Sequence, residues 1–169
     1  MLTKTDALGH SEILTYDAVF NQVLTYTDKN GNSYTNSYDA SGNHVFSSDP
    51  YIETIQRMFN THGEMTSLTD KNGNTTTFDY DACGNITTIT DALGNVQTFA
   101  WSPEGNLTGI TYQSGNASGY SYDPLNRLIK RVNHRGDSIT NEYDPNSNLI
   151  HRTDENGNTA SYAYDALNR

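Results

Sequence analysis

Carboxylates are the residues of this 169-residue chain with the clearest potential for chemistry, because 20 Asp and Glu outnumber 10 Lys and Arg and give a net charge of -10. Paired carboxylates can act as a general acid and base or hold a metal ion. Many of these carboxylates, however, recur at fixed spacing, each followed three residues later by Gly or Asn. A single active site does not repeat in this way, so we interpret them as turn residues and predict no catalytic residue.

Two short stretches, 28–32 and 70–74, superficially resemble calcium-binding loops, since both read Asp-Lys-Asn-Gly-Asn. An EF-hand loop needs Gly at its sixth position and Glu at its twelfth. Here Gly31 and Gly73 come at the fourth position. The spacing therefore predicts no metal site and no cofactor, and calcium at individual turns stays an alternative.

The remaining side chains that could ligate a metal or attack a substrate are scattered along the chain. The five histidines occupy different positions of the repeat described below, and the single thiol stands where a neighbouring repeat has Ser41. No nucleotide-binding, metalloprotease or nucleophile-elbow motif accompanies them. We predict exposed histidines, an exposed thiol and no enzyme. These residues are His10, His44, His62, His134, His151 and Cys83.

An aromatic residue followed by Asp returns every 21 residues. The aromatic positions are 16, 38, 59, 80, 101, 122, 143 and 164, and only the first interval is 22. Phe59-Asn60 and Trp101-Ser102 keep the register in degenerate form. A fixed period of this size indicates a repeat architecture in which one supersecondary unit is copied and stacked.

A second turn motif, offset by half a period, shows that each 21-residue unit is a hairpin. Turn starts fall at alternating intervals of about 11 and 10 residues along the chain, and each is opened by Asp or a related residue. The first residue of such a turn accepts a backbone hydrogen bond, and the fourth needs left-handed backbone, which Gly tolerates. The predicted structural turn residues are Asp28, Gly31, Asp39, Gly42, Asp70, Gly73, Asp81, Gly84, Asp91, Gly94, Asp154 and Gly157.

Three turns depart from this chemistry at their fourth position. Phe20, Ile52 and Ser147 replace the Gly or Asn found elsewhere, so we expect those turns to be irregular. Pro103, Pro124 and Pro145 follow the first residue of their turns, where a preset backbone angle is favourable.

Six or seven residues separate successive turns, which predicts an all-β strip of antiparallel strands and leaves no segment long enough for a helix. Period-two spacing places the aromatics on one face, as a cross-strand ladder. The predicted ladder comprises Tyr38, Phe78, Tyr80, Phe99, Trp101, Tyr120, Tyr122, Tyr143, Tyr162 and Tyr164. The alternate strands carry aliphatics three residues apart, such as Leu107 and Ile110. Either a bulge re-aims one of them, or both faces of the sheet are partly covered.

The composition limits what this strip can bury and bind. Only 34% of the residues are hydrophobic, so we expect a thin sheet held by cross-strand pairs. The acidic charge argues against affinity for nucleic acid or anionic membranes, and no apolar run reaches the length of a membrane span. The basic residues gather in sequence, and we interpret them as a solvated face with cross-strand ion pairs. They are Arg127, Lys130, Arg131, Arg135 and Arg152.

The motifs YDASGN at 38–43, YDACGNITTITDALGN at 80–95, TDKNGN at 69–74 and TDENGN at 153–158 closely resemble the YD repeat, also called the RHS repeat. The resemblance covers essentially the whole chain. It implies that about eight 21-residue hairpins form a strip that curls into a spiral or hollow shell segment. In RHS and Tc toxins such a shell encloses a toxic domain, and a related barrel in the teneurins serves cell-surface adhesion.

By this resemblance we expect residues 1–169 to be a single array of eight repeats, a fragment of a longer array, that is secreted by a bacterium or held at its surface. The leading hypothesis is a non-catalytic wall that encapsulates or scaffolds a toxin cargo. The first alternative is a carbohydrate-binding or adhesion module that uses exposed tyrosines and Trp101. The second is a self-assembling fibre, in which copies or flanking repeats pair through edge strands. No nucleic-acid partner, membrane insertion or cofactor is expected.

Overall fold

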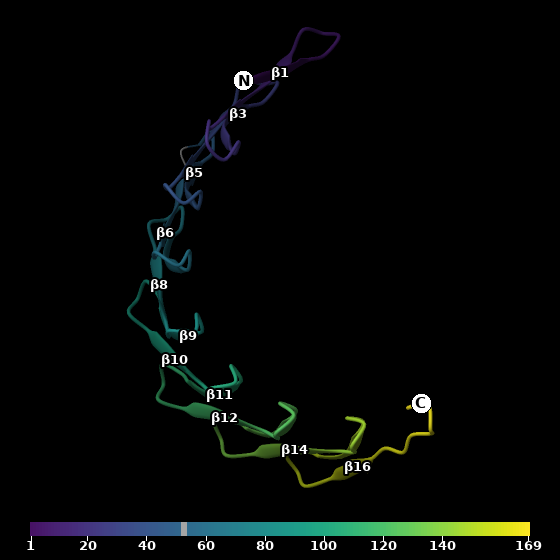
Figure 1. Cartoon of the computed structure of the whole chain (residues 1–169). Coiled ribbons are helices and arrows are strands. Elements are labelled where there is room, and N and C mark those ends of the chain that lie inside the picture. Colours follow the sequence, from purple (N-terminus) through teal and green to yellow (C-terminus); the bar gives the residue numbers. More distant parts are fainter. Residues whose placement is uncertain (52–53) are drawn as a thin grey trace. The chain divides into compact units, whose positions relative to one another are not determined.

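The computed structural model describes residues 1–51 and 54–169, which form sixteen strands (Figure 1). Among these residues there is no helix that could cross a membrane. The odd-numbered strands are β1 (Leu2–Thr5), β3 (Val23–Thr27), β5 (His44–Ser48), β7 (Met65–Thr69), β9 (Ile86–Thr90), β11 (Leu107–Thr111), β13 (Leu128–Val132) and β15 (Leu149–Thr153). The even-numbered strands are β2 (Ser11–Tyr16), β4 (Ser33–Tyr38), β6 (Thr54–Phe59), β8 (Thr75–Tyr80), β10 (Val96–Trp101), β12 (Ala117–Tyr122), β14 (Ser138–Tyr143) and β16 (Thr159–Ser161).

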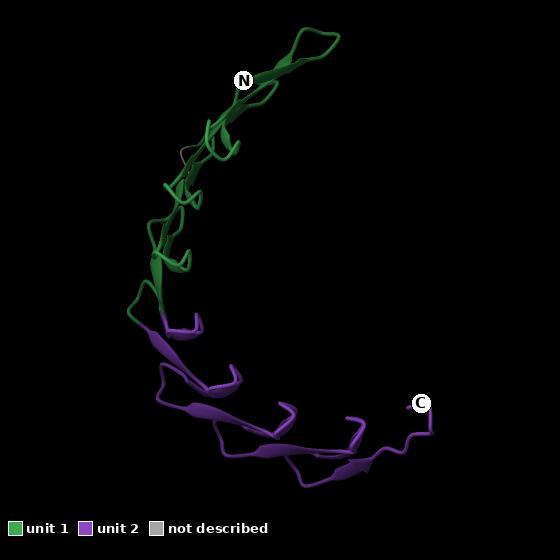
Figure 2. Cartoon of the chain, in the orientation of Figure 1, with its two compact units in different colours: residues 1–79, 90–94 green, residues 80–89, 95–169 purple. Residues whose placement is uncertain are grey.

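The strands belong to one open sheet in which sequence order and spatial order are the same, from β1 to β16. The predicted all-β strip of antiparallel hairpins is therefore confirmed. The chain divides into two compact units, residues 1–79 with 90–94 and residues 80–89 with 95–169 (Figure 2). Each unit is a single layer of strands. The fold follows from turns that are too closely spaced to allow any element other than a short strand.

A β-bulge recurs where an even strand meets the following odd strand. Trp101 lies opposite Leu107, and Ala100 lies opposite Gly109, so Thr108 has no partner in the ladder. Bulges occupy the equivalent place in the β2–β3, β4–β5, β6–β7, β12–β13 and β14–β15 pairs. The bulge shifts the side-chain alternation by one residue. It thereby places aliphatics three residues apart on the same face, which decides the question that the sequence left open.

In the first unit, the register sorts side chains into two chemically different faces. Tyr16 lies opposite Val23, and Phe59 lies opposite Met65. We call this side, which carries the aromatic of the tyrosine-aspartate step, the tyrosine face. The opposite side, which we call the threonine face, carries pairs such as Thr15 with Thr25.

The second unit repeats the same division. On its tyrosine face Phe99 lies opposite Ile110, and Tyr122 lies opposite Leu128. On its threonine face Ser121 lies opposite Lys130. Each face is thus defined by alternation along the strands plus one bulge per hairpin.

Hydroxyl pairs across neighbouring strands characterise the threonine face. The hydroxyl oxygens of Thr15 and Thr25 are 2.6 Å apart, and those of Thr69 and Thr75 and of Thr153 and Thr159 are each 2.8 Å apart. Such pairs contribute a few tenths of a kcal/mol to about 1 kcal/mol each to a sheet.

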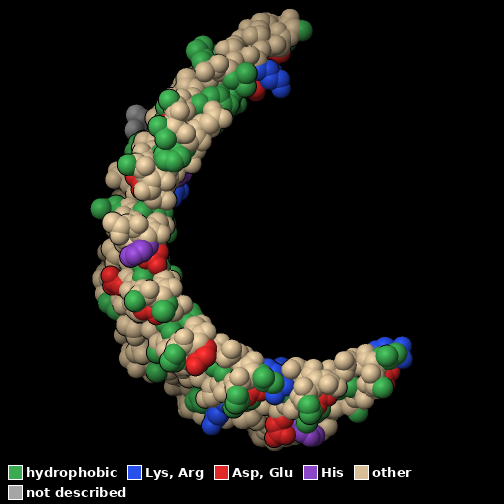
Figure 3. Space-filling view, viewed as in Figure 1, with side chains coloured by type: hydrophobic (Ala, Val, Ile, Leu, Met, Phe, Trp, Pro, Cys, Tyr) green, Lys and Arg blue, Asp and Glu red, His purple; other side chains and the backbone are tan. Residues whose placement is uncertain are grey.

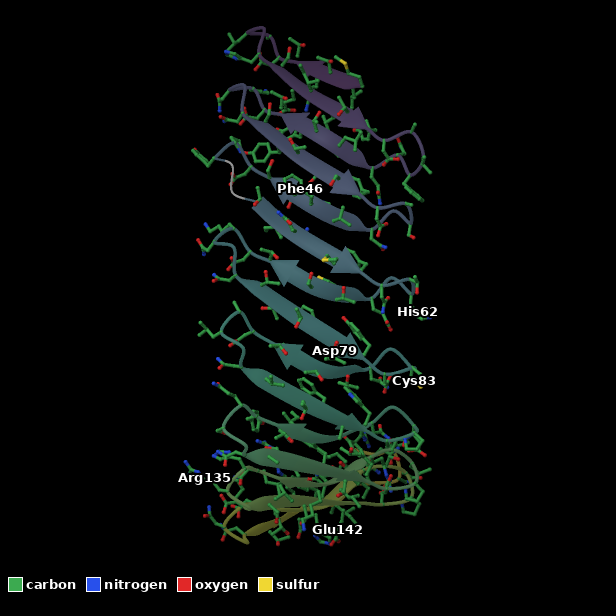
Figure 4. All side chains as sticks on the ribbon, turned by 90° about the vertical axis from the view of Figure 1, so that its left-hand side faces the viewer. Phe46, His62, Asp79, Cys83, Arg135 and Glu142 are labelled. Atoms are coloured by element: carbon green, nitrogen blue, oxygen red, sulfur yellow. The ribbon has the colours of Figure 1, made fainter. Side chains whose placement is uncertain are left out.

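Figure 4 labels three other side chains that lie over the strands, between the two edges at which the turns lie. They are Phe46, Asp79 and Glu142.

No hydrophobic side chain among the described residues is buried, and Ser118, 6% exposed, is the one buried residue of that set. Hydrophobic side chains appear in Figure 3 as small groups separated by polar atoms. A single layer has no second sheet or helix against which to bury a face. Stability therefore rests on half-buried side chains, ladder hydrogen bonds and turns, as the composition predicted.

Candidate functional site

The most elaborate local geometry of the molecule is a five-residue turn closed by its first side chain. In the turn 39–43, the backbone N–H of Asp39 donates to the carbonyl of Asn43, and the N–H of Gly42 donates back to the carbonyl of Asp39, both at 3.0 Å. Oδ1 of Asp39 accepts the backbone N–H groups of Ser41 and Asn43 at 2.9 Å. Oδ2 accepts the side-chain amide of Asn43 at 2.9 Å. The carboxylate is thus fully engaged within its own turn.

This network occurs at the turns that the sequence singled out. The aspartate accepts the backbone N–H two residues on at Asp28, Asp70, Asp81, Asp91 and Asp154, as it does at Asp39. The backbone is left-handed at every predicted glycine, with φ between 81° and 86°. These glycines are Gly31, Gly42, Gly73, Gly84, Gly94 and Gly157. Only a residue without a Cβ takes this conformation freely.

The fifth turn position matters as much as the first, which the sequence patterns did not reveal. In six turns its side chain pairs with the first residue as amide to carboxylate, and arginine replaces the amide in two others, where Arg127 Nε donates to Asp123 Oδ2 at 2.6 Å and Arg169 Nε donates to Asp165 Oδ2 at 3.0 Å. Two turns reverse the pair: the amide of Asn60 donates to Glu64, and that of Asn133 donates to Asp137. The recurring Gly-Asn dipeptide is the signal that would have identified this partner.

Hydrogen bonding to the charged form lowers the pKa of these aspartates. The side-chain amide of Asn43 and then its backbone N–H hold the pKa of Asp39 below its ordinary value of 3.8, although partial desolvation opposes them. The same two donors from Asn74 and Asn158 lower the pKa of Asp70 and Asp154. Such carboxylates stay ionised near neutral pH and are poor general acids.

Two of the three turns predicted to be irregular can be assessed. The turn at Phe20 is one residue longer, because Asp17 N–H donates to the carbonyl of Gln22 and Asn21 takes the left-handed backbone (φ 55°). This insertion explains the single 22-residue interval. The turn at Ser147 is regular, so that prediction was wrong: the serine itself takes φ 69° and keeps both backbone hydrogen bonds. Ile52 lies outside the described residues.

The tyrosine of the repeated step has a polar role beside its packing role. The β3–β4 ladder ends at Thr25, so the carbonyl of Val23 lies beyond it, and Tyr38 Oη and Asn36 Nδ2 each donate to that carbonyl at 3.1 Å. In the second unit, Tyr143 Oη donates to Leu128 O at 3.1 Å, and Tyr164 Oη donates to Leu149 O at 3.1 Å.

Trp101 preserves this bond in a different chemical form. Its indole Nε1–H donates to the carbonyl of Ile86 at 2.7 Å, the same repeat position that the tyrosines reach. Phe59 has no donor and keeps only the packing. Of the two degenerate steps, Trp101 therefore keeps both the packing and the hydrogen bond of the tyrosine, whereas Phe59 keeps the packing alone.

In the predicted aromatic ladder the rings do not face one another, because side chains of the intervening strands lie between them. The members of the predicted ladder from Tyr38 to Tyr143 lie on even strands, and the odd strands between them place aliphatic side chains opposite several of them, as Leu149 lies opposite Tyr143. Tyr162 and Tyr164 follow β16 and lie outside the strands. Among the described residues, the stacked pair is Tyr26 with Tyr34, with ring centroids 5.6 Å apart, and neither belongs to the predicted set. The Tyr38 ring lies 5.2 Å from the ring of His44.

Turns on one edge are linked to one another by the side chains of their last residues. We call the turns that follow even strands YD turns and those that follow odd strands TD turns. Gln22 Nε2 donates to Gly42 O at 3.1 Å in the first unit, while Asn148 Nδ2 donates to Asn168 Oδ1 at 2.9 Å in the second. Each bond joins two successive YD turns. A side chain therefore bridges hairpins that are two strands apart.

Sequence comparison identifies the family. The RHS repeat model matches residues 59–96, 101–138 and 143–169. The chain belongs to the RHS repeat family. Each match begins at the aromatic of a YD step and the first two span two hairpins, which agrees with the geometry. No curated protein sequence matches the chain.

Solved structures show the same RHS fold at low sequence identity. The crystal structure of TcdB2-TccC3-Cdc42 matches with a TM-score of 0.71 and 17% identity over 92% of this chain and 10% of that one. The Photorhabdus luminescens Tc holotoxin pore with a TccC3 variant matches with a TM-score of 0.66 and 17% identity, over 90% and 9%. The chain thus spans about a tenth of the length of the solved chains that it matches.

The basic residues of this RHS array do not share one face, contrary to the interpretation of their clustering. Arg127 lies in a YD turn, where its Cζ is 4.8 Å from the centre of the Tyr143 ring. Lys130 lies on the threonine face, and Arg131 lies on the tyrosine face. Figure 4 shows Arg135 on the edge of the second unit opposite to Cys83. The expected cross-strand ion pairs are replaced by a pair within one turn.

The remaining reactive side chains of the RHS array do not converge. Residues 1–51 and 54–169 contain no group of three or more His, Cys, Asp or Glu arranged to hold a metal ion. Cys83 is exposed at the third position of its turn. An open hollow of about 680 Å³ lies in the second unit, lined chiefly by Glu104, Tyr120, Tyr122 and Asn126.

Proposed function

We propose that this chain is a non-catalytic segment of the wall of a secreted bacterial toxin shell, and that the wall encloses a polypeptide cargo. The observation that carries the proposal is a one-layer sheet that needs no core. Each hairpin closes its own turns and joins its neighbours by ladders and by side chains between turns. Such a unit can be repeated without limit and provides area rather than a pocket. Family membership and the shared fold support this role.

The engagement of the carboxylates supports a structural role rather than catalysis. Asp28, Asp39 and Asp70 use both carboxylate oxygens to close their own turns, so neither oxygen is placed for proton transfer to a substrate. Their lowered pKa values act in the same direction. We accordingly assign the array no enzymatic step and no cofactor.

The array is proposed to continue into flanking repeats of the same kind. The sheet ends in the edge strands β1 and β16, on each of which a further hairpin of this sequence pattern can add its ladder. The chain corresponds to about a tenth of the solved chains with this fold. Residues 1–169 are then one array within a larger wall, and its partners are further repeats and the enclosed cargo.

Electron cryomicroscopy of the full-length gene product tests the wall proposal directly. We expect a closed shell with density inside it, and limited trypsinolysis should leave the enclosed segment intact until urea opens the wall. A matched sample digested after urea treatment controls for intrinsic resistance of that segment. An extended strip with no lumen, or equal cleavage before and after urea, overturns the proposal.

Carbohydrate binding is a second candidate, favoured by the open hollow in the second unit. Tyr120 and Tyr122 offer ring faces there, and Asn126 and Glu104 offer polar groups, a combination suited to a sugar. A glycan screen with wild type and Tyr120→Ala tests it, and Trp101→Ala serves as the comparison because the Trp101 indole is engaged with Ile86 O. Absence of binding by the wild type rejects this candidate.

A further inference from the structure

Two arginines occupy a repeat position that is aliphatic in the three preceding hairpins. Leu68, Ile89 and Ile110 stand at intervals of 21 residues, and Arg131 and Arg152 continue the series. Aliphatic side chains at this position pack on the tyrosine face, as Ile110 does opposite Phe99. The change to arginine places a positive charge on an otherwise apolar surface.

The register confirms that both arginines lie on the tyrosine face of the second unit. Arg131 stands between Tyr120 on one neighbouring strand and Ile139 on the other. The equivalent neighbours of Arg152 are Asn141 and Ala160. All four neighbours are uncharged, so no cross-strand carboxylate balances either guanidinium.

Both arginines are exposed, and beyond the backbone bonds of the sheet neither guanidinium forms an ion pair or a hydrogen bond with any part of the chain that the structure describes. Arg127 shows the contrast within the same unit. It donates to Asp123 Oδ2 at 2.6 Å, to Asp144 O at 2.9 Å and to Ser147 Oγ at 3.2 Å. Arg131 and Arg152 keep all their donors for another molecule.

The tyrosine face from β11 to β16 carries no carboxylate among its described strand residues. Glu142 is the acidic residue of these strands, and it lies on the threonine face opposite His151. The other acidic residues of this region lie in turns, as Asp123 and Asp144 do. A chain with a net charge of -10 therefore presents one locally positive face.

We infer that this face binds an acidic, extended segment of a polypeptide. Arg131 and Arg152 are on strands two apart, about 10 Å across the sheet, and they face Ile139 and Asn141, two residues apart along β14, so their backbones are separated by about 12 Å. A polyproline II segment advances about 3.1 Å per residue and repeats every three residues, so carboxylates three residues apart lie on one side at about 9 Å, and the long arginine side chains can reach across the difference. Each carboxylate would accept paired hydrogen bonds from one guanidinium, while Ile139, on the strand between the two arginines, and Tyr120, on the other side of Arg131, offer contact for apolar side chains of the segment.

The charge of the whole chain favours a polypeptide over a nucleic acid as the ligand. Binding to a nucleic-acid backbone requires many phosphate contacts by Lys and Arg. Here two arginines stand on one face of an acidic protein. A peptide with isolated carboxylates among apolar residues needs only the two contacts that the surface provides.

Titration of the 15N-labelled chain with synthetic peptides, followed by NMR, tests the inference. The probe is four copies of Glu-Pro-Pro, and the control peptide replaces each glutamate by glutamine. We expect shifts of the Nε–Hε signals of Arg131 and Arg152 with the acidic peptide alone. The variant Arg131→Ile/Arg152→Ile, which restores an aliphatic residue at each site, should bind about tenfold more weakly.

The variant Lys130→Thr/Arg135→Asn is the matched control, since it also removes two positive charges but none from the tyrosine face. Its affinity should stay within about twofold of the wild type if the two arginines form the site. Equal weakening in both variants would show a response to net charge alone and overturn the inference. Binding of the glutamine peptide as tightly as the acidic one, or of oligothymidylate more tightly, would also overturn it.

Discussion

The YD turns and the TD turns share one hydrogen-bonding scheme, but their surroundings differ. In both, the first residue exchanges backbone bonds with the fourth and fifth, as in the YD turn at Asp81 and the TD turn at Asp70. Among the described strand pairs, the bulge lies just after the YD turns, in the odd strand that follows, and there an aromatic side chain reaches past the end of a ladder. Side chains of the last turn residues also join successive YD turns.

Links between successive TD turns are of a different kind. Lys29 Nζ donates to Asp6 Oδ2 at 3.2 Å, and Asn133 Nδ2 donates to Glu155 Oε1 at 3.2 Å. These contacts are exposed and partly ionic, so each contributes little. The difference between the two sets of turns shows that aspartate closes most turns of both sets, whereas the aromatic accompanies the bulge. The tyrosine-aspartate step thus combines two independent structural elements at the end of a strand, the aromatic beside the bulge and the aspartate of the turn.

Acid should break both sets of turns together, which is the largest effect that we predict. The folded-state pKa of the turn aspartates, including Asp39, Asp70 and Asp154, is below 3.8. Their contribution is fully present above pH 3.8 and is lost as the pH falls through the lower folded-state values. Circular dichroism from pH 6 to 2 measures the loss of folded structure, and amide hydrogen exchange distinguishes the YD turns on one edge from the TD turns on the other. Survival of either set at pH 2 would contradict a shared mechanism.

Trp101→Ala, on the YD side of one hairpin, should lower the free energy of unfolding by about 2 kcal/mol, roughly half the loss typical of a fully buried Trp. The substitution removes the ring opposite Leu107 and the hydrogen bond to Ile86 O. Urea unfolding measures the change. It is followed by circular dichroism, because the substitution removes the single tryptophan and with it the tryptophan fluorescence signal. Trp101→Phe keeps the ring and should lose about 1 kcal/mol. Equal losses in the two variants would assign the whole effect to the hydrogen bond.

Gly73→Ala in a TD turn and Gly105→Ala in a YD turn should destabilise the chain equally, by about 1 kcal/mol each. Their φ angles are 81° and 82°, and a Cβ at either glycine would meet no atom within 4 Å. Backbone strain is therefore the only difference between glycine and alanine that matters. Gly109→Ala, in a strand, is the control and should not destabilise. Clearly unequal losses would show that the two sets of turns differ in their backbone chemistry.

Tyr143→Phe should lower the free energy of unfolding by about 1 kcal/mol, because the carbonyl of Leu128 loses a donor. Thr153→Val removes the exposed 2.8 Å bond to Thr159 beside a TD turn and should lose less. Parallel urea titrations of the two variants compare the loss of unfolding free energy when one side-chain hydrogen bond is removed at each edge. A larger loss for Thr153→Val would reverse the ranking of the two edges.

Mild acid should have the smallest effect, confined to the YD side of the first unit. Partial burial, and next the charge of Arg57, lower the pKa of His44 below 6.5. Its Nε2 lies 3.0 Å from Asn36 Oδ1. Stability is then full above pH 6.5 and falls as the pH drops through the lower folded-state value. His44→Leu, which restores the aliphatic residue of other repeats, should abolish the dependence between pH 7 and 5. Persistence of that dependence would exclude His44 as its source.

Much of the fold could be predicted from sequence because turn chemistry is local. Asp39 and Gly42 interact within five residues, so their spacing alone indicates the turn. The regular turn at Ser147 could not be predicted, since a serine takes left-handed backbone only where its surroundings favour it. The partner of each aspartate was missed because a four-residue turn pattern ignores the fifth side chain.

The sequence by itself determined the period, the strand lengths, the turn residues and the absence of helical segments, because each of these depends on residues close in the chain. Only the tertiary structure decided which side chains share a face, since one bulge per hairpin reverses the alternation and a bulge exists only relative to a neighbouring strand. That register places Leu128 and Arg131, three residues apart, on one face and brings Tyr143 to the carbonyl of Leu128. Cross-strand pairing, which period and composition do not encode, therefore turned a row of hairpins into a sheet with two distinct surfaces.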